Sequence, residues 1–285
     1  MTAWRKIERE ERDTLGEGAL WSARDQALYW VDILAPALNR MTLADGTIRR
    51  WALDEPLGWV AEDLSGTLVG GFQSGFKRLV LEPFGVTAIS DPEPDLPGNR
   101  MNDGKADRHG AIWCGTMDMA EEHARGSLYR LAPDGTCAVM DSDYMVPNGP
   151  AFSPCGRWLY HSDTARRTTY RFALDENGLP SGKEVFLKFE EGDGYPDGMT
   201  CDAEGYLWVA HWDGARISRF APDGTLERTI PLPAQRITNI AFAGPDLDRM
   251  FVTSAATGLP DSAYDGALFE VDSGVRGVAA GVFAG

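Results

Sequence analysis

Pairs of apolar residues recur along the chain at intervals of roughly 40 to 48 residues, which is the repeat length of propeller blades. Each pair follows a polar turn and has the short apolar pattern of a buried β-strand. The six pairs are Leu28-Tyr29, Leu68-Val69, Ile112-Trp113, Leu159-Tyr160, Leu207-Trp208 and Met250-Phe251. The spacing therefore predicts six repeats of one structural unit.

The residues around each pair predict a four-stranded antiparallel unit. A turn rich in Asp, Ser, Pro and Gly comes directly before the pair, as at residues 202–205 (DAEG), and such residues favour hairpin turns. A third apolar segment with a basic residue follows, and a turn such as Pro-Asp-Gly then precedes a fourth strand. Four short strands per repeat are typical of a propeller blade. Because no long segment has a helical period, we predict an all-β fold, a six-bladed β-propeller.

The whole chain, residues 1–285, is expected to form one domain, because no Ser/Gly-rich linker separates the repeats. A last blade closed only by residues 281–283 would leave an open sheet edge. Residues 4–9, which include Trp4 and Ile7, precede the first repeat and have no partner of their own. We predict that this N-terminal strand completes the last blade.

Composition and charge narrow the class of protein. Apolar residues make up 43% and charged residues 25% of the chain, which is ordinary for a soluble globular protein. The formal net charge of −16 argues against binding to nucleic acid, which needs Lys and Arg clusters, and against binding to anionic lipid. No apolar run reaches the roughly 18 residues that a membrane span needs. We expect no nucleic-acid or membrane partner.

The N-terminus and the cysteines indicate the compartment. The first ten residues contain no apolar signal segment, and the four cysteines, Cys114, Cys137, Cys155 and Cys201, form no Cys-x-x-Cys pair. We therefore expect a cytoplasmic protein with reduced thiols, either a monomer or a weak homo-oligomer.

Polar residues stand at the predicted start of the innermost strand in most repeats. In a propeller these strands line a central channel and begin at one face, so their first residues meet at the channel mouth. Glu17, Asn102, Asn148 and Asp197 occupy such positions, and each is followed by Gly or Asp-Gly, which lets the backbone approach a bound group closely. The matching positions in the other two repeats are residues 58–61 and Thr238 with Asn239.

Two of these residues are carboxylates, which would repel each other in a low-dielectric channel unless a cation neutralised them. With the amide oxygens of Asn148 and Asn102, the carboxylates of Glu17 and Asp197 form an all-oxygen set that suits Ca²⁺, Mg²⁺ or Mn²⁺. So few protein ligands would leave positions open for water and substrate, as in catalytic metal sites. We predict a central site for one divalent metal ion.

Five segments resemble the signature segments of the SMP-30/gluconolactonase family, which includes regucalcin and bacterial sugar lactonases. They are residues 15–21 (LGEGALW), 99–105 (NRMNDGK), 115–117 (GTM), 147–149 (PNG) and 195–199 (YPDGM). The resemblance covers essentially the whole chain. It implies a lactonase, which is a carboxylic ester hydrolase, that opens a sugar lactone such as a glucono-, xylono- or arabinonolactone to the aldonic acid.

The resemblance also implies roles for individual residues. In the family, residues matching Glu17, Asn148 and Asp197 hold a single divalent metal; Ca²⁺ is the first expectation here, with Zn²⁺, Mn²⁺, Mg²⁺ or Fe²⁺ as alternatives. Residues matching Arg100 and Asn102 contact the substrate. An acidic residue after Gly-Thr-Met does so too, and here either Glu121 or Glu122 takes that place. The lysine that regucalcin carries shortly before its Asn-Gly has no clear match in residues 140–145.

The expected mechanism follows from these roles. The metal would polarise the lactone carbonyl while Asp197 activates the attacking water as general base. Arg100 would orient sugar hydroxyls or stabilise the developing oxyanion. Trp59 and Tyr195, at mouth positions, are expected either to stack on the sugar or only to pack at the mouth. His109, His123, His161 and His211 do not share the mouth position, which disfavours a mechanism based on a histidine pair.

Two alternatives stay open. The same metal site could hydrolyse organophosphates or other esters. The chain could also be a calcium-binding propeller without turnover.

Overall fold

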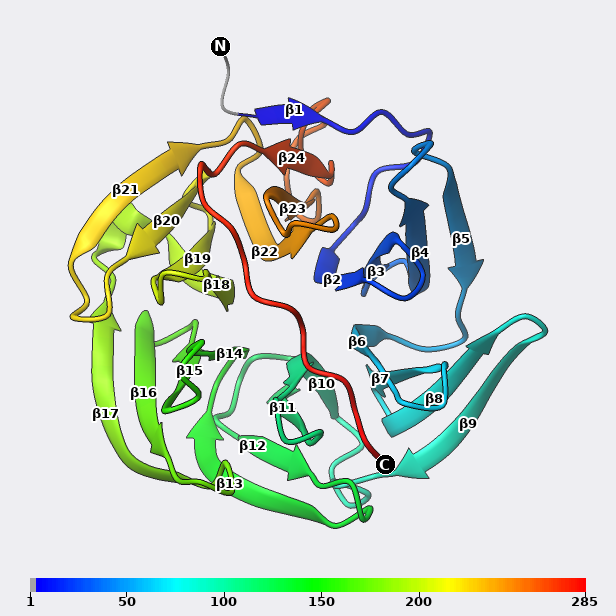
Figure 1. Ribbon diagram of the computed structural model, residues 1–285, viewed down its shortest axis with the longest axis vertical. Helices are drawn as coiled ribbons and strands as arrows, with labels where there is room; N and C mark the ends of the chain where they lie inside the picture. Colours follow the sequence, from blue (N-terminus) through cyan, green and yellow to red (C-terminus); the bar gives the residue numbers. More distant parts are fainter. Residues whose placement is uncertain (1–3) are drawn as a thin grey trace.

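The molecule is a ring of six four-stranded antiparallel sheets, the blades, arranged around a common centre (Figure 1). The structure is a computed structural model that describes residues 4–285, so residues 1–3 of the expected domain lie outside the described part. The predicted fold class, an all-β six-bladed propeller, is confirmed. All six apolar pairs lie in the second strand of their blades.

The strands of each blade follow one another from the centre outward. Blade 1 contains β2 (Gly16–Ser22), β3 (Ala27–Asp32), β4 (Ala37–Thr42) and β5 (Ile48–Ala52), and blade 2 contains β6 (Leu57–Glu62), β7 (Leu68–Phe72), β8 (Gly75–Leu81) and β9 (Phe84–Ser90). Blade 3 contains β10 (Asn99–Ala106), β11 (Ile112–Asp118), β12 (Gly126–Leu131) and β13 (Cys137–Tyr144), and blade 4 contains β14 (Pro147–Phe152), β15 (Trp158–Asp163), β16 (Thr168–Leu174) and β17 (Pro180–Lys188). Blade 5 contains β18 (Tyr195–Cys201), β19 (Leu207–Trp212), β20 (Arg216–Phe220) and β21 (Leu226–Pro231).

Blade 6 is built from both ends of the chain. It contains β22 (Arg236–Ala243), β23 (Arg249–Ala255) and β24 (Phe269–Val271), and β1 (Trp4–Lys6) forms its outer strand. β1 runs antiparallel to β24, with Trp4 opposite Val271. The Trp4 ring also meets the ring of Phe269 edge-on, with 5.7 Å between ring centroids. The first strand thus covers an edge that would otherwise be open.

In blades 3 and 5, the turn after the inner strand ties the blade together in the same way. In blade 5, Asp202 Oδ1 accepts two backbone N–H groups of its own turn, and its Oδ2 accepts the indole N–H of Trp208 at 2.9 Å. Asp107 makes the same bonds in blade 3, including the indole N–H of Trp113 at 2.8 Å. Bonds to an ionised acceptor are stronger than neutral ones, so these buried carboxylates fix the turn and the large ring together.

All six inner strands contain a β-bulge, in which one extra residue on the inner strand disturbs its pairing with the second strand. Bulges bend a strand and redirect its side chains, and they often occur beside functional sites. The residues skipped by the pairing are Gly18-Ala19, Gly58, Asn102-Asp103, Gly149-Pro150, Asp197-Gly198 and Thr238-Asn239. The predicted mouth residues are therefore part of these bulges or directly precede them.

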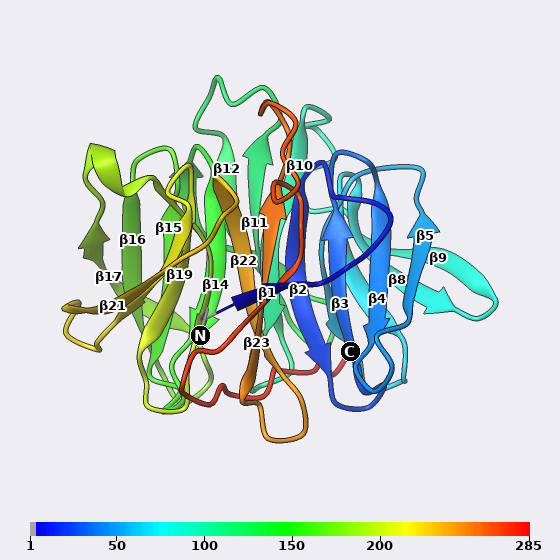
Figure 2. The ribbon, with the colours of Figure 1, turned by 90° about the horizontal axis from the view of Figure 1, so that it is seen from above.

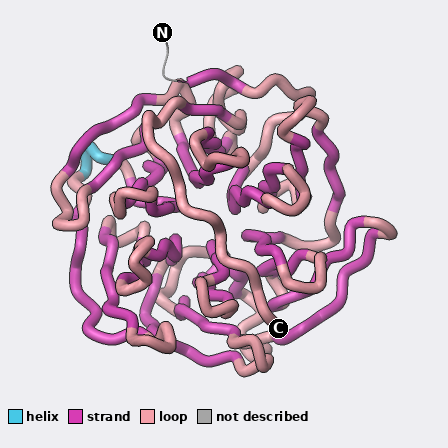
Figure 3. Tube along the Cα trace, viewed as in Figure 1, coloured by secondary structure: helices cyan, strands magenta, loops and turns pink. Residues whose placement is uncertain are grey.

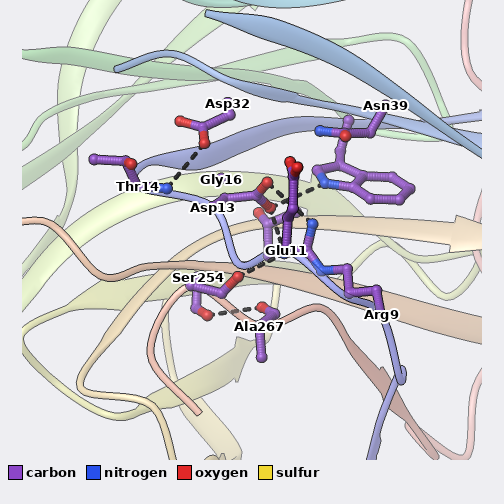
Figure 4. Close-up of polar contacts among 12 residues, drawn as sticks. Arg9, Glu11, Asp13, Thr14, Gly16, Asp32, Asn39, Ser254 and Ala267 are labelled. Atoms are coloured by element: carbon purple, nitrogen blue, oxygen red, sulfur yellow. Dashed lines mark hydrogen bonds and ion pairs between the residues drawn. The ribbon is translucent and has the colours of Figure 1, made fainter. Parts of the chain in front are cut away.

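A polar network fixes the start of β2 (Figure 4). Asp32, at the end of β3, accepts the backbone N–H groups of Thr14 and the following residue at 2.9 and 3.1 Å. Asp13 is bound by both terminal nitrogens of Arg9, at 3.0 and 2.6 Å. These bonds hold the segment that leads into Glu17.

The C-terminal strap, residues 272–285, crosses the face of the ring where the inner strands end (Figure 2). Along its path Arg276 accepts the N–H of Ala203 in blade 5 at 2.9 Å, and Phe283 donates to Glu62 in blade 2 at 2.8 Å. Ala284 then donates to Gly110 in blade 3 at 3.0 Å. The strap therefore connects blade 5 with blades 2 and 3.

Strands and loops make up nearly all of the molecule (Figure 3). Within residues 4–285, the only helical segment is a single 3₁₀ turn, Glu191–Asp193. That part of the chain contains no helix with the length and apolar character needed to cross a membrane.

Candidate functional site

The mouth residues of four blades line one cavity of about 420 Å³. It lies where the inner strands begin, on the face opposite the C-terminal strap. Its polar lining residues are Glu17, Arg100, Asn102, Glu121, Asn148, Thr164, Tyr195, Asp197 and Asp213. Blade 1 supplies the glutamate at position 17, and blades 3, 4 and 5 supply the others.

Three buried carboxylates lie at this cavity: Glu17 and Asp197 line it, and Asp103 lines the cavity on the other side of the channel. Burial and the nearby charge of Asp103 raise the pKa of Glu17 to about 8. Burial also raises the pKa of Asp197 well above its usual range, and the negative charges of Glu17 and Asp103 raise it further. Glu17 Oε2 accepts the Gly18 N–H and an N–H of Asn239, both at 3.0 Å. The raised pKa values mean that these carboxyl groups resist ionising together unless a cation is bound.

The side chain of Asn148 is held so that its carbonyl oxygen faces the channel. Its Nδ2 donates to Thr164 Oγ1 at 2.8 Å, and that hydroxyl donates to the Pro196 carbonyl at 2.6 Å. Its Oδ1 accepts from Asn102 Nδ2 at 3.2 Å. Since the amide nitrogen is engaged at the blade, the amide oxygen remains the group that Asn148 presents to a cation.

The Arg100 guanidinium lies beside Asn102 at the cavity. Its Nη1 donates to Asn102 Oδ1 at 2.7 Å and to the Met101 carbonyl at 3.0 Å. Burial lowers the pKa of Arg100 to about 10, against the attraction of Glu17, Glu121 and Asp197. A positive charge therefore stands at the mouth opposite the carboxylates.

This donor set fits a divalent cation. Glu17, Asn148 and Asp197 offer two carboxylates and one amide oxygen, which are hard ligands. Burial raises the pKa of both carboxyl groups, and the charge of Glu17 raises that of Asp197 further, so a positive ion is their natural partner. Within residues 4–285, no group of three or more His, Cys, Asp or Glu side chains is arranged to hold a metal, so the asparagine is essential to the set.

Two predicted substrate residues line the cavity rim. Glu121 lies on the cavity and Glu122 does not, and a positive φ of 55° at Glu121 turns the chain there. Tyr195 also lines the cavity, and the Arg167 guanidinium lies over its ring at 4.2 Å.

Trp59 is not at the site, contrary to our expectation. Its side chain has no exposed surface and belongs to an apolar cluster between blades 2 and 3, so it cannot stack on a sugar. The indole occupies the space left by Gly71, where a Cβ would lie 2.2 Å from Trp59 Nε1. Gly58 is the bulge residue of this inner strand, so blade 2 brings no polar side chain to the mouth.

The histidines do not line the cavity either. His161 is fully buried, and its ring meets that of Tyr144 edge-on. His211 Nδ1 bonds to the Asp193 carbonyl at 2.7 Å.

The sequence analysis gave no role to four residues that shape the site. Asn239 Nδ2 bridges Glu17 at 3.0 Å and Asp103 at 3.4 Å, and Gly198 allows this, because a Cβ there would lie 2.4 Å from that nitrogen. Asp163 accepts two backbone N–H groups of the segment before Asn148, as Asp32 does before Glu17. The fourth residue is Thr164, the partner of Asn148. Asn239 stands at a mouth position of the repeat pattern, and each aspartate ends the second strand of its blade, whereas Thr164 had no such signal.

The chain is similar in sequence to known proteins. Residues 15–256 match the family model described as SMP-30/Gluconolactonase/LRE-like region. The chain is 36% identical over 277 residues to 6-deoxy-6-sulfogluconolactonase of Pseudomonas putida, covering 95% of each sequence. It is 34% identical over 287 residues to pentonolactonase XacC of Haloferax volcanii, covering 97% of this chain and 96% of that protein.

A solved structure is similar over nearly the whole chain. It is that of regucalcin from Agrobacterium tumefaciens, described as a calcium-binding protein, with 32% sequence identity and a TM-score of 0.94. The match covers 99% of this chain and 97% of that one.

Proposed function

The chain belongs to the SMP-30/gluconolactonase/LRE-like family, and we propose that it hydrolyses a sugar lactone with one divalent cation bound by Glu17, Asn148 and Asp197. The observation that carries this proposal is that two buried carboxylates, Glu17 and Asp197, line a cavity large enough for a small molecule. A bound cation would supply a Lewis acid for the lactone carbonyl.

Asp197 is the proposed general base. It lies in the cavity wall at the bulge of β18, where one carboxylate oxygen can face the cation and the other a water in the cavity. Glu17 takes a different role, because its Oε2 already accepts two N–H groups and is fixed in place. This difference supports Asp197 rather than Glu17 as the base.

The cationic and polar mouth residues would hold the lactone. Arg100 offers a guanidinium to the oxygen on which negative charge develops, and Asn102 keeps that guanidinium in place through Oδ1. Glu121 and Tyr195 stand at the rim, where a carboxylate can accept bonds from sugar hydroxyls and a ring can cover an apolar sugar face.

The substrate class is an aldonolactone. The two lactonases compared above act on lactones of a modified hexose acid and of pentose acids, as their names state. Ca²⁺ is the first metal to test, because the donors are all oxygens and the similar regucalcin is described as calcium-binding.

A lactone panel crossed with metals tests the proposal. Protein freed of metal with a chelator is reloaded with Ca²⁺, Mg²⁺, Mn²⁺, Zn²⁺ or Fe²⁺, and acid release from each lactone is followed with a pH indicator. We expect metal-dependent opening of at least one aldonolactone, loss of metal binding in Glu17→Ala, and loss of most turnover in Asp197→Asn even at metal concentrations that saturate this variant.

Asp213→Asn is the matched control. Asp213 lines the same cavity, but its carboxylate is held by Arg236 at 2.8 Å, so this variant should keep its activity. Tight metal binding without opening of any lactone would favour a calcium-binding propeller instead. Hydrolysis of an organophosphate ester but of no lactone would favour the other enzymatic alternative.

A further inference from the structure

Two aromatic side chains line the cavity of the candidate site from one blade. They are Tyr195, the first residue of β18, and Trp212, the last residue of β19. The two residues stand directly opposite each other in the antiparallel pairing of these strands, so their side chains lie on the same face of the sheet. Both are half-buried. Blade 5 therefore presents an aromatic wall, Tyr195 together with Trp212, to the cavity.

Each ring of the aromatic wall is backed by an arginine. The Arg167 guanidinium lies over the Tyr195 ring at 4.2 Å, and that of Arg236 lies over the Trp212 ring at 4.5 Å. Arg236 is itself held in place, because its Nε donates to Asp213 Oδ1 at 2.8 Å. A cation over the face of an aromatic ring attracts that ring. One face of the indole is thus taken by Arg236, so a ligand in the cavity meets the remaining surface of Trp212.

The backbone around the aromatic wall is tied together as well. His211 Nδ1 bonds to the Asp193 carbonyl at 2.7 Å, and Arg216 Nη2 donates to Asp193 Oδ1 at 2.6 Å. These bonds join β19 and β20 to the segment that leads into β18. Gly194 has a φ of 75°, and a Cβ there would lie 2.6 Å from the Trp212 carbonyl, so only glycine allows this close approach. The wall is therefore built into blade 5.

An aromatic wall beside polar groups suits a cyclic sugar derivative. A lactone ring carries hydroxyl groups around its edge and C–H bonds on its faces, so one face can lie against an aromatic ring while the edge makes hydrogen bonds. The open-chain aldonate has no such flat face, because its carbon chain rotates about single bonds. Contact with the wall is thus worth more to the substrate than to the product of hydrolysis.

We propose that Trp212 is a specificity-determining residue of this site: its indole, with the ring of Tyr195, holds the cyclic lactone by one C–H face and favours it over the open-chain aldonate. The inference rests on the proposed function for its substrate class, but it concerns binding of the ring and not the steps of hydrolysis. The stacking role that the sequence led us to expect of the buried Trp59 then belongs to a tryptophan of blade 5.

The experiment measures the binding of two unreactive ligands to the Ca²⁺-loaded protein by calorimetric titration. The lactam of gluconic acid represents the ring, because an amide resists hydrolysis, and gluconate represents the open-chain product. In Trp212→Ala we expect the lactam to bind about tenfold more weakly and the affinity for gluconate to change by less than about threefold. Trp158→Ala is the matched control. Arg171 lies over that ring at 4.3 Å, but Trp158 does not line the cavity, so both affinities should be unchanged.

Trp212→Phe and Trp212→Leu keep the test valid if Trp212→Ala fails to fold. Both put an apolar side chain in place of the indole, but only phenylalanine is flat. Trp212→Phe should keep lactam affinity within about threefold, whereas Trp212→Leu should weaken it as alanine does. Equal weakening of lactam and gluconate binding, or native lactam affinity in a folded Trp212→Ala or Trp212→Leu, overturns the role of Trp212 alone. If the unmodified protein neither binds the lactam nor opens any lactone, the proposed function is refuted as well.

Discussion

The hydroxyl of Thr164 orients a proposed metal ligand without reaching the ion, so Thr164→Val isolates the effect of that orientation. Valine has nearly the shape of threonine but neither accepts from Asn148 Nδ2 nor donates to the Pro196 carbonyl, bonds of 2.8 and 2.6 Å. Two lost hydrogen bonds should lower the free energy of unfolding by about 1 to 2 kcal/mol. The freed Asn148 amide can rotate and present its nitrogen to the cation. Loss of such a supporting bond typically weakens metal affinity about tenfold to a hundredfold.

The assay is titration of chelator-treated protein with Ca²⁺, combined with urea unfolding. Thr169→Val is the matched control: this buried hydroxyl of the same blade bonds to Ser162 at 2.7 Å and touches no mouth residue. It should lose stability yet keep its metal affinity. Thr164→Ser should restore binding, because serine keeps the hydroxyl. Native Ca²⁺ affinity in Thr164→Val would show that Asn148 is not held by this bond, or is not a ligand.

Three further predictions concern other parts of the molecule. Burial lowers the pKa of His161 to about 3, whereas an unfolded histidine titrates near pH 6.5, so between these pH values this site binds a proton only in the unfolded chain. The free energy of unfolding therefore falls as the pH falls through that window, by about 2 kcal/mol between pH 7 and pH 5. His161→Phe should remove that part of the decline, as measured by urea unfolding. An unchanged pH dependence in His161→Phe would contradict this. Phe283, in the strap, is 2% exposed and packs into the apolar cluster between blades 2 and 3, so Phe283→Ala should lower the free energy of unfolding by about 3 kcal/mol. A loss below about 1 kcal/mol would mean that the strap contributes little to stability. Arg100→Ala should lower kcat/KM for the best lactone by about tenfold or more while leaving Ca²⁺ affinity nearly intact, and an unchanged kcat/KM would remove Arg100 from the site.

The repeat pattern was sufficient to predict the fold and to bring Glu17, Asn148 and Asp197 to one cavity. Each blade repeats the same turn and the same strand order, so residues at matching positions meet at one face. The N-terminal strand followed from the physical cost of an open sheet edge.

The position of individual side chains could not be predicted as well. Trp59 was placed at the mouth because it stands at the matching position, but the bulge at Gly58 and the missing side chain of Gly71 direct its ring between the blades. A glycine such as Gly58 marks a possible bulge, but the direction of the neighbouring side chain depends on the pairing between strands. The bridge from Asn239 to Glu17 spans 222 sequence positions, so only the closed ring reveals it.

The central claim is that a single cation held by Glu17, Asn148 and Asp197 makes lactone opening possible. The most direct measurement is the rate of lactone opening as chelator-treated protein receives increasing equivalents of metal. We predict negligible turnover without metal and a rise that levels off at about one equivalent per chain, in step with calorimetric binding. Full turnover in the presence of chelator would contradict the account.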